Sequence, residues 1–161
     1  MTKAVVFDFD GVIAETESLQ LEAYNILLKQ FNAPPLPETT FIREYVGLPS
    51  LKIVEHLSSK FDISKSAEEL VSLKESLYEE LLLKTSLKTR SGLVELLEQL
   101  KINGWHLAIA SSSPTATLNK LLVTLNVDKY FWPVLSSDSV NQGKPAPDIY
   151  ELAVTYSAQI N

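Results

Sequence analysis

The sequence predicts an α/β fold, a parallel sheet interrupted after its first strand by an all-helical insertion. Three short apolar runs at 4–7, 106–110 and 134–136 are each followed by a helical pattern, and this alternation is typical of a parallel sheet. From about residue 15 to residue 84 the sequence shows helical periodicity and no strand pattern. The insertion therefore belongs between the first and the second strand.

These observations divide the chain into two predicted domains. Residues 1–14 and 86–161 are expected to form a discontinuous α/β core, and residues 15–85 an inserted helical domain. An insertion that follows a strand carrying acidic residues is the usual position of a cap, a domain that closes over substrate and excludes water.

The helices of the insertion are delimited by prolines and by capping residues. The first must end before Pro34, a short second one is centred on 41–45, and a third opens at Pro49. Ser66 and Glu69 have the spacing of a capping box, which begins a helix that runs to about Lys84. That helix is expected to turn its leucines inward, namely Leu70, Leu73, Leu77 and Leu81, with Leu82 as a further candidate.

In the core, the run Ala4–Phe7 is too short for a surface helix and is expected to be a buried strand. A helix over 91–102 precedes the second strand and a helix over 115–125 follows it. Val134–Ser136 is predicted to be a weak outer strand, and Pro147 suits the first turn of a last helix.

Composition excludes several classes of function. The net charge of -6 argues against nucleic acid and anionic membranes as main partners. The absence of cysteine excludes disulfides, thiol catalysis and metal sites built from cysteine. No apolar run is long enough to span a bilayer, and no signal peptide is recognisable, so we expect a soluble cytoplasmic protein. The sequence does not indicate an oligomeric state.

Polar residues follow each predicted strand. Asp8 and Asp10 end the first, Ser111 and Ser112 end the second, and Lys144 lies in a stiff loop after the third. In an open α/β sheet, ligands bind at the carboxyl ends of the strands. Hydroxyl groups, backbone N–H groups and an ammonium suit a phosphoryl group, while two neighbouring carboxylates suit Mg²⁺. For the two aspartates considered alone, a solvated turn is the alternative.

Three motifs make the chain resemble the haloacid dehalogenase (HAD) superfamily, in the branch of small-sugar phosphatases and β-phosphoglucomutase. They are Asp8–Ile13 with Thr16 and Glu17, Ala108–Ser113, and Gly143–Tyr150. The resemblance implies a Rossmann-like core with a helical cap and Mg²⁺-dependent phosphoryl transfer through an aspartyl phosphate.

The same resemblance implies roles for individual residues. Asp8 would be the nucleophile, Asp10 the general acid and base, and both would serve the metal. Ser111, Ser112 and Lys144 would bind phosphate. The expected reaction is hydrolysis of a small phosphorylated metabolite, most simply a sugar phosphate.

The chain also departs from the family pattern. Relatives usually continue for two more strands, one of which carries further acidic residues that complete the metal site. We therefore expect this chain to be a C-terminally truncated fragment; otherwise Asp138 is the nearest acid that could complete the metal shell. Gln20 stands where mutases carry a hinge histidine. Lys74 resembles a cap lysine that reaches substrate, and an ordinary solvated helix face is the alternative.

Two other functions therefore stay open at this point. One is a β-phosphoglucomutase-type isomerase, which needs a second phosphate site in the cap. The other is a non-catalytic HAD-like binding module or inactive fragment, suggested by the missing acids.

Overall fold

The computed structural model describes residues 3–46 and 48–159, which divide into two compact units. The first unit comprises residues 1–16 and 86–161, and the second comprises residues 17–85. The chain thus crosses between units after residue 16, where the sequence predicted residue 14, and again after residue 85. We call them the sheet unit and the helical unit.

A three-stranded parallel sheet forms the centre of the sheet unit, in the order β1-β2-β3. Its strands are β1 (Lys3–Phe7), β2 (Trp105–Ala110) and β3 (Val134–Leu135). Phe7 is in register with Ile109, which is in register with Val134. Because the strands are parallel, their carboxyl ends meet at one edge of the sheet.

One prediction about the sheet is wrong. The run Ala4–Phe7 was expected to be buried, but Ala4 is exposed, Val5 and Val6 are half-buried, and Phe7 alone of these four is buried. The reason is strand order: in the described sheet β1 pairs with β2 on one side only, so β1 is an edge strand like β3. β2 is central, and its last four residues are buried.

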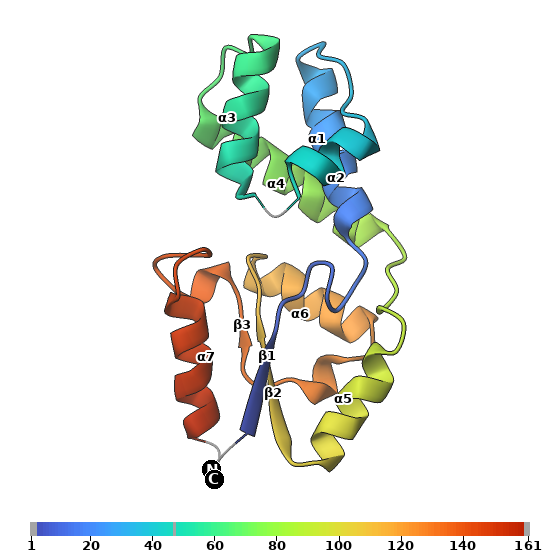
Figure 1. Cartoon of the computed structure of the whole chain (residues 1–161), viewed down its shortest axis with the longest axis vertical. Helices are drawn as coiled ribbons and strands as arrows, with labels where there is room; N and C mark the ends of the chain where they lie inside the picture. Colours follow the sequence, from blue (N-terminus) through green and yellow to red (C-terminus); the bar gives the residue numbers. More distant parts are fainter. Residues whose placement is uncertain (1–2, 47, 160–161) are drawn as a thin grey trace. The chain divides into compact units, whose positions relative to one another are not determined.

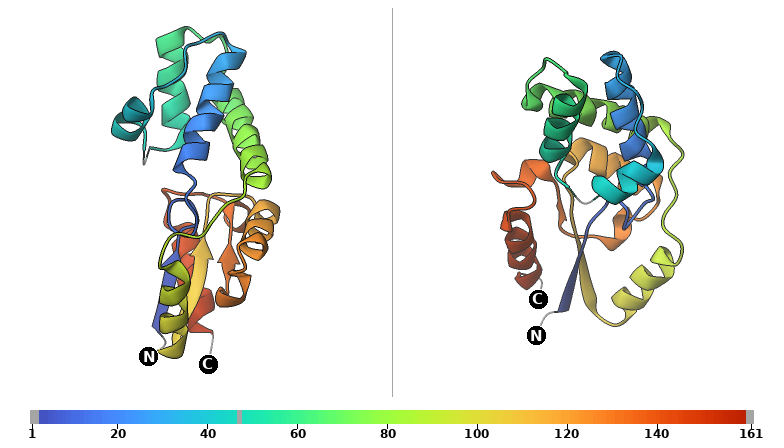
Figure 2. Two further views of the ribbon diagram at one scale, coloured as in Figure 1. Left: turned by 90° about the vertical axis from the view of Figure 1, so that its right-hand side faces the viewer. Right: turned by 45° about the horizontal axis from the view of Figure 1, so that its top comes forward.

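Helices cover both faces of this sheet. Figures 1 and 2 show α7 (Asp148–Ala158) on one face, with α5 (Leu93–Ile102) and α6 (Thr115–Thr124) on the other. Two short 3₁₀ helices, η1 (Asp128–Tyr130) and η2 (Ser137–Ser139), flank β3 in the sequence. The core under α7 consists of small and aliphatic side chains, namely Ala108, Ala110, Leu135, Ile149 and Ala153.

The sheet unit itself ties together the two ends of the insertion. After β1 the chain turns at Gly11, whose φ of 70° favours glycine, and the Ile13 N–H donates to the Phe9 carbonyl at 2.9 Å. Ala14 then forms a bridge with Thr89, and the Arg90 N–H donates to the Ile13 carbonyl at 3.0 Å. The chain can therefore leave and re-enter this unit without disturbing its sheet.

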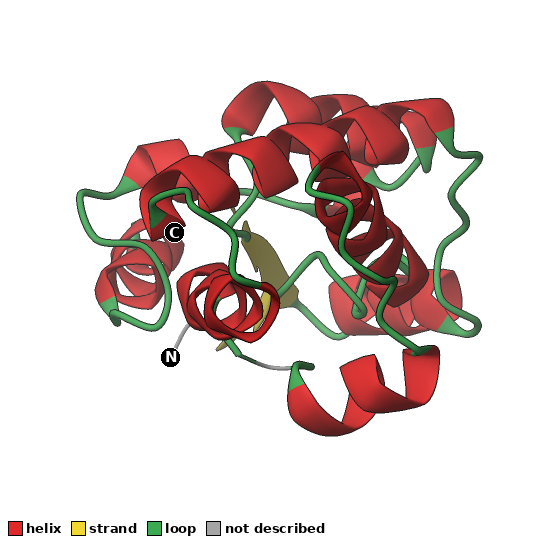
Figure 3. Cartoon of the chain, turned by 90° about the horizontal axis from the view of Figure 1, so that it is seen from above, coloured by secondary structure: helices red, strands yellow, loops and turns green. Residues whose placement is uncertain are grey.

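The described residues of the helical unit form helices and loops without a strand (Figure 3). Its helices are α1 (Glu17–Gln30), α2 (Glu38–Glu44), α3 (Ser50–Phe61) and α4 (Ala67–Lys84). Its core is aliphatic and aromatic, with Tyr24, Leu27, Leu28, Phe41, Tyr45, Val54, Leu57 and Leu70 among its buried side chains. Among the described residues of the chain, no helix is long and apolar enough to cross a bilayer.

The inward face of α4 differs from the prediction. Leu70 and Leu82 are buried as expected, but Leu73 is exposed, and Leu77 and Leu81 are only half-buried. The buried stripe instead repeats every four residues, through Leu70, Lys74, Tyr78 and Leu82. Leucine spacing failed as a guide because this helix buries a lysine at the centre of its packed face.

The capping box at the start of α4 is confirmed. The Glu69 N–H donates to Ser66 Oγ at 3.2 Å, and the Ser66 N–H donates to Glu69 Oε2 at 3.1 Å. The Lys65 ammonium and the Ser66 N–H hold the pKa of Glu69 below its usual value. Its contribution to stability is thus present above the unfolded-state pKa and is lost as the pH falls through the lower folded-state value.

We predict that Ser66→Ala lowers the free energy of unfolding of the helical unit by about 1 kcal/mol, because it leaves the N-terminal donors of α4 unsatisfied. Urea denaturation followed by circular dichroism measures the change, with Ser72→Ala, an exposed site within the same helix, as the matched control. Equal stability of the two variants would show that the cap contributes nothing.

Candidate active site

The candidate site lies at the carboxyl ends of the three parallel strands of the sheet unit. Asp8 is the first residue after β1, Ser111 the first after β2, and Ser136 the first after β3. Lys144 comes from the loop between η2 and α7. The parallel register brings these strand ends to the same edge of the sheet.

Lys144 connects two of the strand ends. Its Nζ lies 2.9 Å from Asp8 Oδ1 and donates to the Ala110 carbonyl at 2.8 Å. The same Nζ lies 5.5 Å from the centre of the Tyr150 ring, on the first turn of α7. The lysine side chain is 18% exposed and that of Asp8 is 44% exposed, so the pair is open to a ligand on the aspartate side.

The two oxygens of Asp8 differ in their surroundings. Oδ1 accepts both from Lys144 and from the Phe9 N–H, at 2.9 and 2.7 Å. Oδ2 has no bonded donor among the described residues of this unit. Oδ1 therefore fixes the orientation of the carboxylate, and Oδ2 is the oxygen that a ligand could approach.

Asp10 has a different partner. Thr16 Oγ1, completely buried, donates to Asp10 Oδ1 at 3.0 Å and accepts the Gly11 N–H at 3.2 Å. In the sequence Thr16 is recognisable only as part of the motif that begins at Asp8, and no sequence pattern reveals this bond. Asp8 and Asp10 were expected to end the first strand, but β1 ends at Phe7, before both of them. The turn and Thr16 orient Asp10.

The loop after β2, residues 111–114, is called the serine loop here. Ser111 is fully buried; its N–H donates to the Leu135 carbonyl at 3.0 Å, and its Oγ accepts the Ser113 N–H at 3.1 Å. Ser112 is exposed. The hydrogen bonds of Ser111 therefore fix the shape of the loop, while the side chain of Ser112 lies in solvent.

The oxygen ligands at the strand ends suit a metal ion only in part. Asp8 and Asp10 supply the carboxylate oxygens that Mg²⁺ prefers, and this ion is commonly held by one or two carboxylates plus substrate phosphate and water. Among the described residues no three acids, histidines or cysteines form a group that could hold a metal. Asp138 in particular does not join the pair, because its Oδ2 accepts the Thr115 N–H at 2.7 Å. Asp8 and Asp10 therefore fit Mg²⁺ as part of its coordination shell.

Gln20 and Lys74 meet inside the helical unit. Lys74 is 1% exposed, and its Nζ donates to Gln20 Oε1 and lies 3.2 Å from Glu75 Oε1. The rings of Tyr24 and Tyr78 lie 5.1 and 4.7 Å from the ammonium, and burial raises the pKa of the Tyr24 hydroxyl. The solvated-face alternative for Lys74 is therefore wrong: aromatic rings and an amide replace water around its charge.

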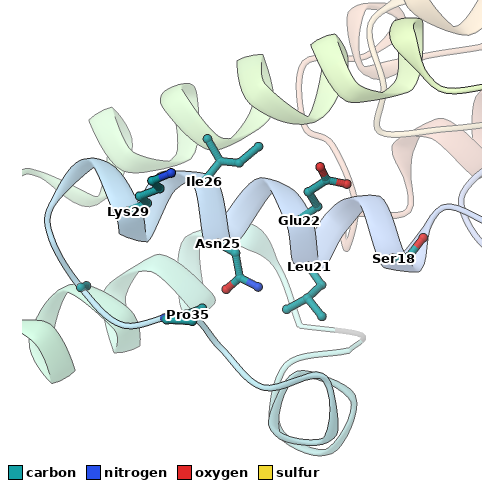
Figure 4. Close-up of a pocket in the computed structure, with 8 residues that line it drawn as sticks. Ser18, Leu21, Glu22, Asn25, Ile26, Lys29 and Pro35 are labelled. Carbon is teal, nitrogen blue, oxygen red and sulfur yellow. The ribbon is translucent and has the colours of Figure 1, made fainter.

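A groove of about 450 Å³ follows the outer side of α1 (Figure 4). It is lined by one face of that helix and the loop after it, namely Ser18, Leu21, Glu22, Asn25, Ile26, Lys29, Ala33 and Pro35. Asn25 closes one side by accepting the Leu36 N–H at 2.7 Å. The groove contains none of the candidate catalytic residues.

Sequence comparisons agree with the geometry. A family model described as "Haloacid dehalogenase-like hydrolase" matches residues 5–159. The phosphorylated carbohydrates phosphatase of Thermotoga maritima is 32% identical over 154 residues, which cover 94% of this chain and 69% of that protein. The phosphoglycolate phosphatase of Nitrosospira multiformis is 32% identical over 149 residues, covering 90% of this chain and 65% of that protein.

Solved structures show the same fold. A putative beta-phosphoglucomutase from Thermotoga maritima superposes with a TM-score of 0.69 at 30% identity, covering 99% of this chain and 72% of that one. A HAD hydrolase of family IA, variant 3, from Entamoeba histolytica gives a TM-score of 0.76 at 27% identity, covering 99% of this chain and 71% of that one.

We predict that Lys74→Met leaves the stability of the helical unit unchanged or raises it, because a buried ammonium replaced by an apolar chain of similar volume no longer has to be desolvated. Lys74→Ala should instead cost about 2–5 kcal/mol, since it leaves a cavity. Chemical denaturation of both variants measures the difference. If methionine destabilises as much as alanine, the polar contacts of Lys74, rather than its volume, hold this unit together.

Proposed function

Because the chain belongs to the haloacid dehalogenase-like hydrolase family, we propose that it is a phosphatase of small phosphorylated metabolites, with sugar phosphates as the favoured substrate class. The observation that carries the proposal is the Asp8–Lys144 pair at the strand ends, 2.9 Å apart and open on the side of Asp8 Oδ2. Similarity to a phosphatase of phosphorylated carbohydrates supports the substrate class.

In the proposed reaction Asp8 Oδ2 attacks the phosphorus atom of the ester. The bond between phosphorus and the leaving oxygen breaks, and Asp10 gives that oxygen its proton. Water then attacks the phosphorus of the aspartyl phosphate while Asp10 takes a proton back. Inorganic phosphate leaves, and Asp8 is again a carboxylate. The hydrogen bond from buried Thr16 supports this role for Asp10, because it fixes the direction of the carboxyl group.

The cationic and polar groups of the site would reduce the repulsion between the anionic nucleophile and the anionic ester. Two unit charges 4 Å apart interact by about 4 kcal/mol at an effective dielectric of 20, so an anionic nucleophile strongly repels an anionic ester. Lys144 offsets that repulsion next to the attacking carboxylate. Ser112, exposed at the serine loop, is the proposed ligand of the phosphate oxygens, and Ser111, which is buried and bonded to the Ser113 N–H, stays a candidate through the family resemblance.

The carboxylate of Asp8 and the backbone carbonyl of Asp10 would hold Mg²⁺, with phosphate and water as further ligands, so that the Asp10 carboxyl group is reserved for proton transfer. When bound, the ion would neutralise charge on the transferring phosphoryl group. The helical unit is the proposed cap, and Gln20 and Lys74 stay candidates for substrate selection there. A cytoplasmic location also stays a prediction.

A phosphate-release assay over a panel of sugar phosphates tests this proposal. We predict turnover that requires Mg²⁺ and disappears with a chelator, and we expect Asp8→Asn to lower it by orders of magnitude while the protein stays folded. Asp128→Asn, an exposed acid outside the site, serves as the control. Wild-type turnover in Asp8→Asn would overturn the mechanism.

A phosphosugar mutase is the second candidate, favoured by the similarity to a putative beta-phosphoglucomutase. The assay supplies β-glucose 1-phosphate with a bisphosphate primer and measures glucose 6-phosphate and free phosphate in one reaction. We predict that phosphate release exceeds isomerisation. By the family resemblance, mutases carry a histidine at the position where this chain has Gln20. The reverse ratio would establish the mutase.

A further inference from the structure

The serine loop is held by the segment that follows β3. The Ser111 N–H donates to the Leu135 carbonyl at 3.0 Å, and the Ser137 N–H donates to the Ser113 carbonyl at 3.3 Å. Farther along, Thr115 Oγ1 lies 2.6 Å from the buried Ser136 Oγ. These bonds run from one end of the loop to the other, so its conformation depends on the neighbouring turn.

Asp138 adds a hydrogen bond with a charged acceptor to those that hold the serine loop. Its Oδ2 accepts the Thr115 N–H at 2.7 Å. Thr115 is the first residue of α6, and the residue before it, Pro114, makes no side-chain cap. Asp138 thus supplies, from 23 residues farther along the chain, the oxygen that a local N-cap would supply. This bond holds the pKa of Asp138 below its usual value.

The turn that carries Asp138 is itself ordered by short-range bonds. The Asp138 N–H donates to Ser136 Oγ at 3.2 Å, and the Ser136 N–H donates to Ser139 Oγ at 2.9 Å. The carboxylate is therefore presented by a preformed turn.

The other end of the serine loop is tied to the lysine. Lys144 Nζ donates to the carbonyl of Ala110, the residue immediately before Ser111, at 2.8 Å. The segment from η2 to Lys144 therefore contacts both ends of the loop: Lys144 holds its start, and Asp138, within η2, holds the start of the helix that follows it. Ser112, which has to meet the phosphate, lies between these two anchors.

We propose that Asp138 is a positioning residue, which sets the serine loop in register with Lys144 so that both meet one phosphoryl group. It acts through Thr115 and does not touch the reacting atoms. The inference rests on the proposed function, since it assigns phosphate binding to that loop. A displacement of about 1 Å in a group that orients a substrate is enough to weaken its binding markedly.

The test compares Asp138→Ala with Asp138→Asn in the 161-residue chain. For each variant, KM and kcat are measured with the best sugar phosphate, and the Kd of inorganic phosphate is measured by calorimetry. We expect Asp138→Ala to raise KM and Kd by about five- to tenfold with kcat within about twofold, the pattern of lost uniform binding. Asp138→Asn, which keeps an oxygen acceptor, should stay close to wild type.

A second pair of variants removes the same bond from the donor side. Thr115→Pro deletes the N–H at a helix position that tolerates proline, and Thr115→Ala deletes only the hydroxyl. We expect the proline variant to bind phosphate more weakly than the alanine variant, and Asp138→Ala to add nothing further to it. This pair decides the question if Asp138→Ala does not fold. Asp128→Ala controls for loss of an exposed acid.

Unchanged KM and Kd in folded Asp138→Ala would overturn the inference, and so would an Asp138→Asn variant as impaired as the alanine variant. Failure of the proposed function looks different, because wild-type protein would then bind inorganic phosphate without turning over esters. The Kd comparison would still decide the role of Asp138 in that case. Wild-type protein that does not bind phosphate at all would overturn both.

Discussion

The ammonium of Lys144 is the group on which the site depends. It lies between a carboxylate at the end of β1 and a carbonyl at the end of β2, 2.9 and 2.8 Å away. A lysine held between these two partners keeps the loop after β3 against the ends of the other strands. In the proposed mechanism it also offsets the negative charge of Asp8, which would let this carboxylate attack an ester that is itself anionic.

Much of the sheet unit could be predicted from the sequence, because short apolar runs followed by helices permit few topologies. Asp8, Ser111 and Lys144 were placed at the strand ends by the same reasoning, and the structure brings them to one edge. The partners of Asp10 could not be found in this way. Thr16 lies six residues farther on, and only the turn at Gly11 brings its hydroxyl back to Asp10.

The predictions for the burial of β1 and for the inward face of α4 were wrong, because the pattern of apolar residues does not determine either of them. Burial of β1 depends on how many neighbours a strand has, and a strand sequence does not specify its neighbours. The inward face of α4 was assigned to leucines, whereas the helix buries Lys74 between two tyrosine rings. Aromatic rings and an amide can solvate an ammonium, so a charged residue does not always mark the exposed face of a helix.

If Asp8 is the nucleophile, turnover passes through a covalent bond between Asp8 and phosphorus. Rapid acid quenching of the enzyme during turnover, followed by peptide mass spectrometry, measures this directly. We predict one phosphoryl group on the peptide that contains Asp8, located at Asp8 by fragmentation and absent from Asp8→Asn. Active enzyme that shows no phosphorylated peptide at any quench time, or that carries the group on another residue, would contradict it.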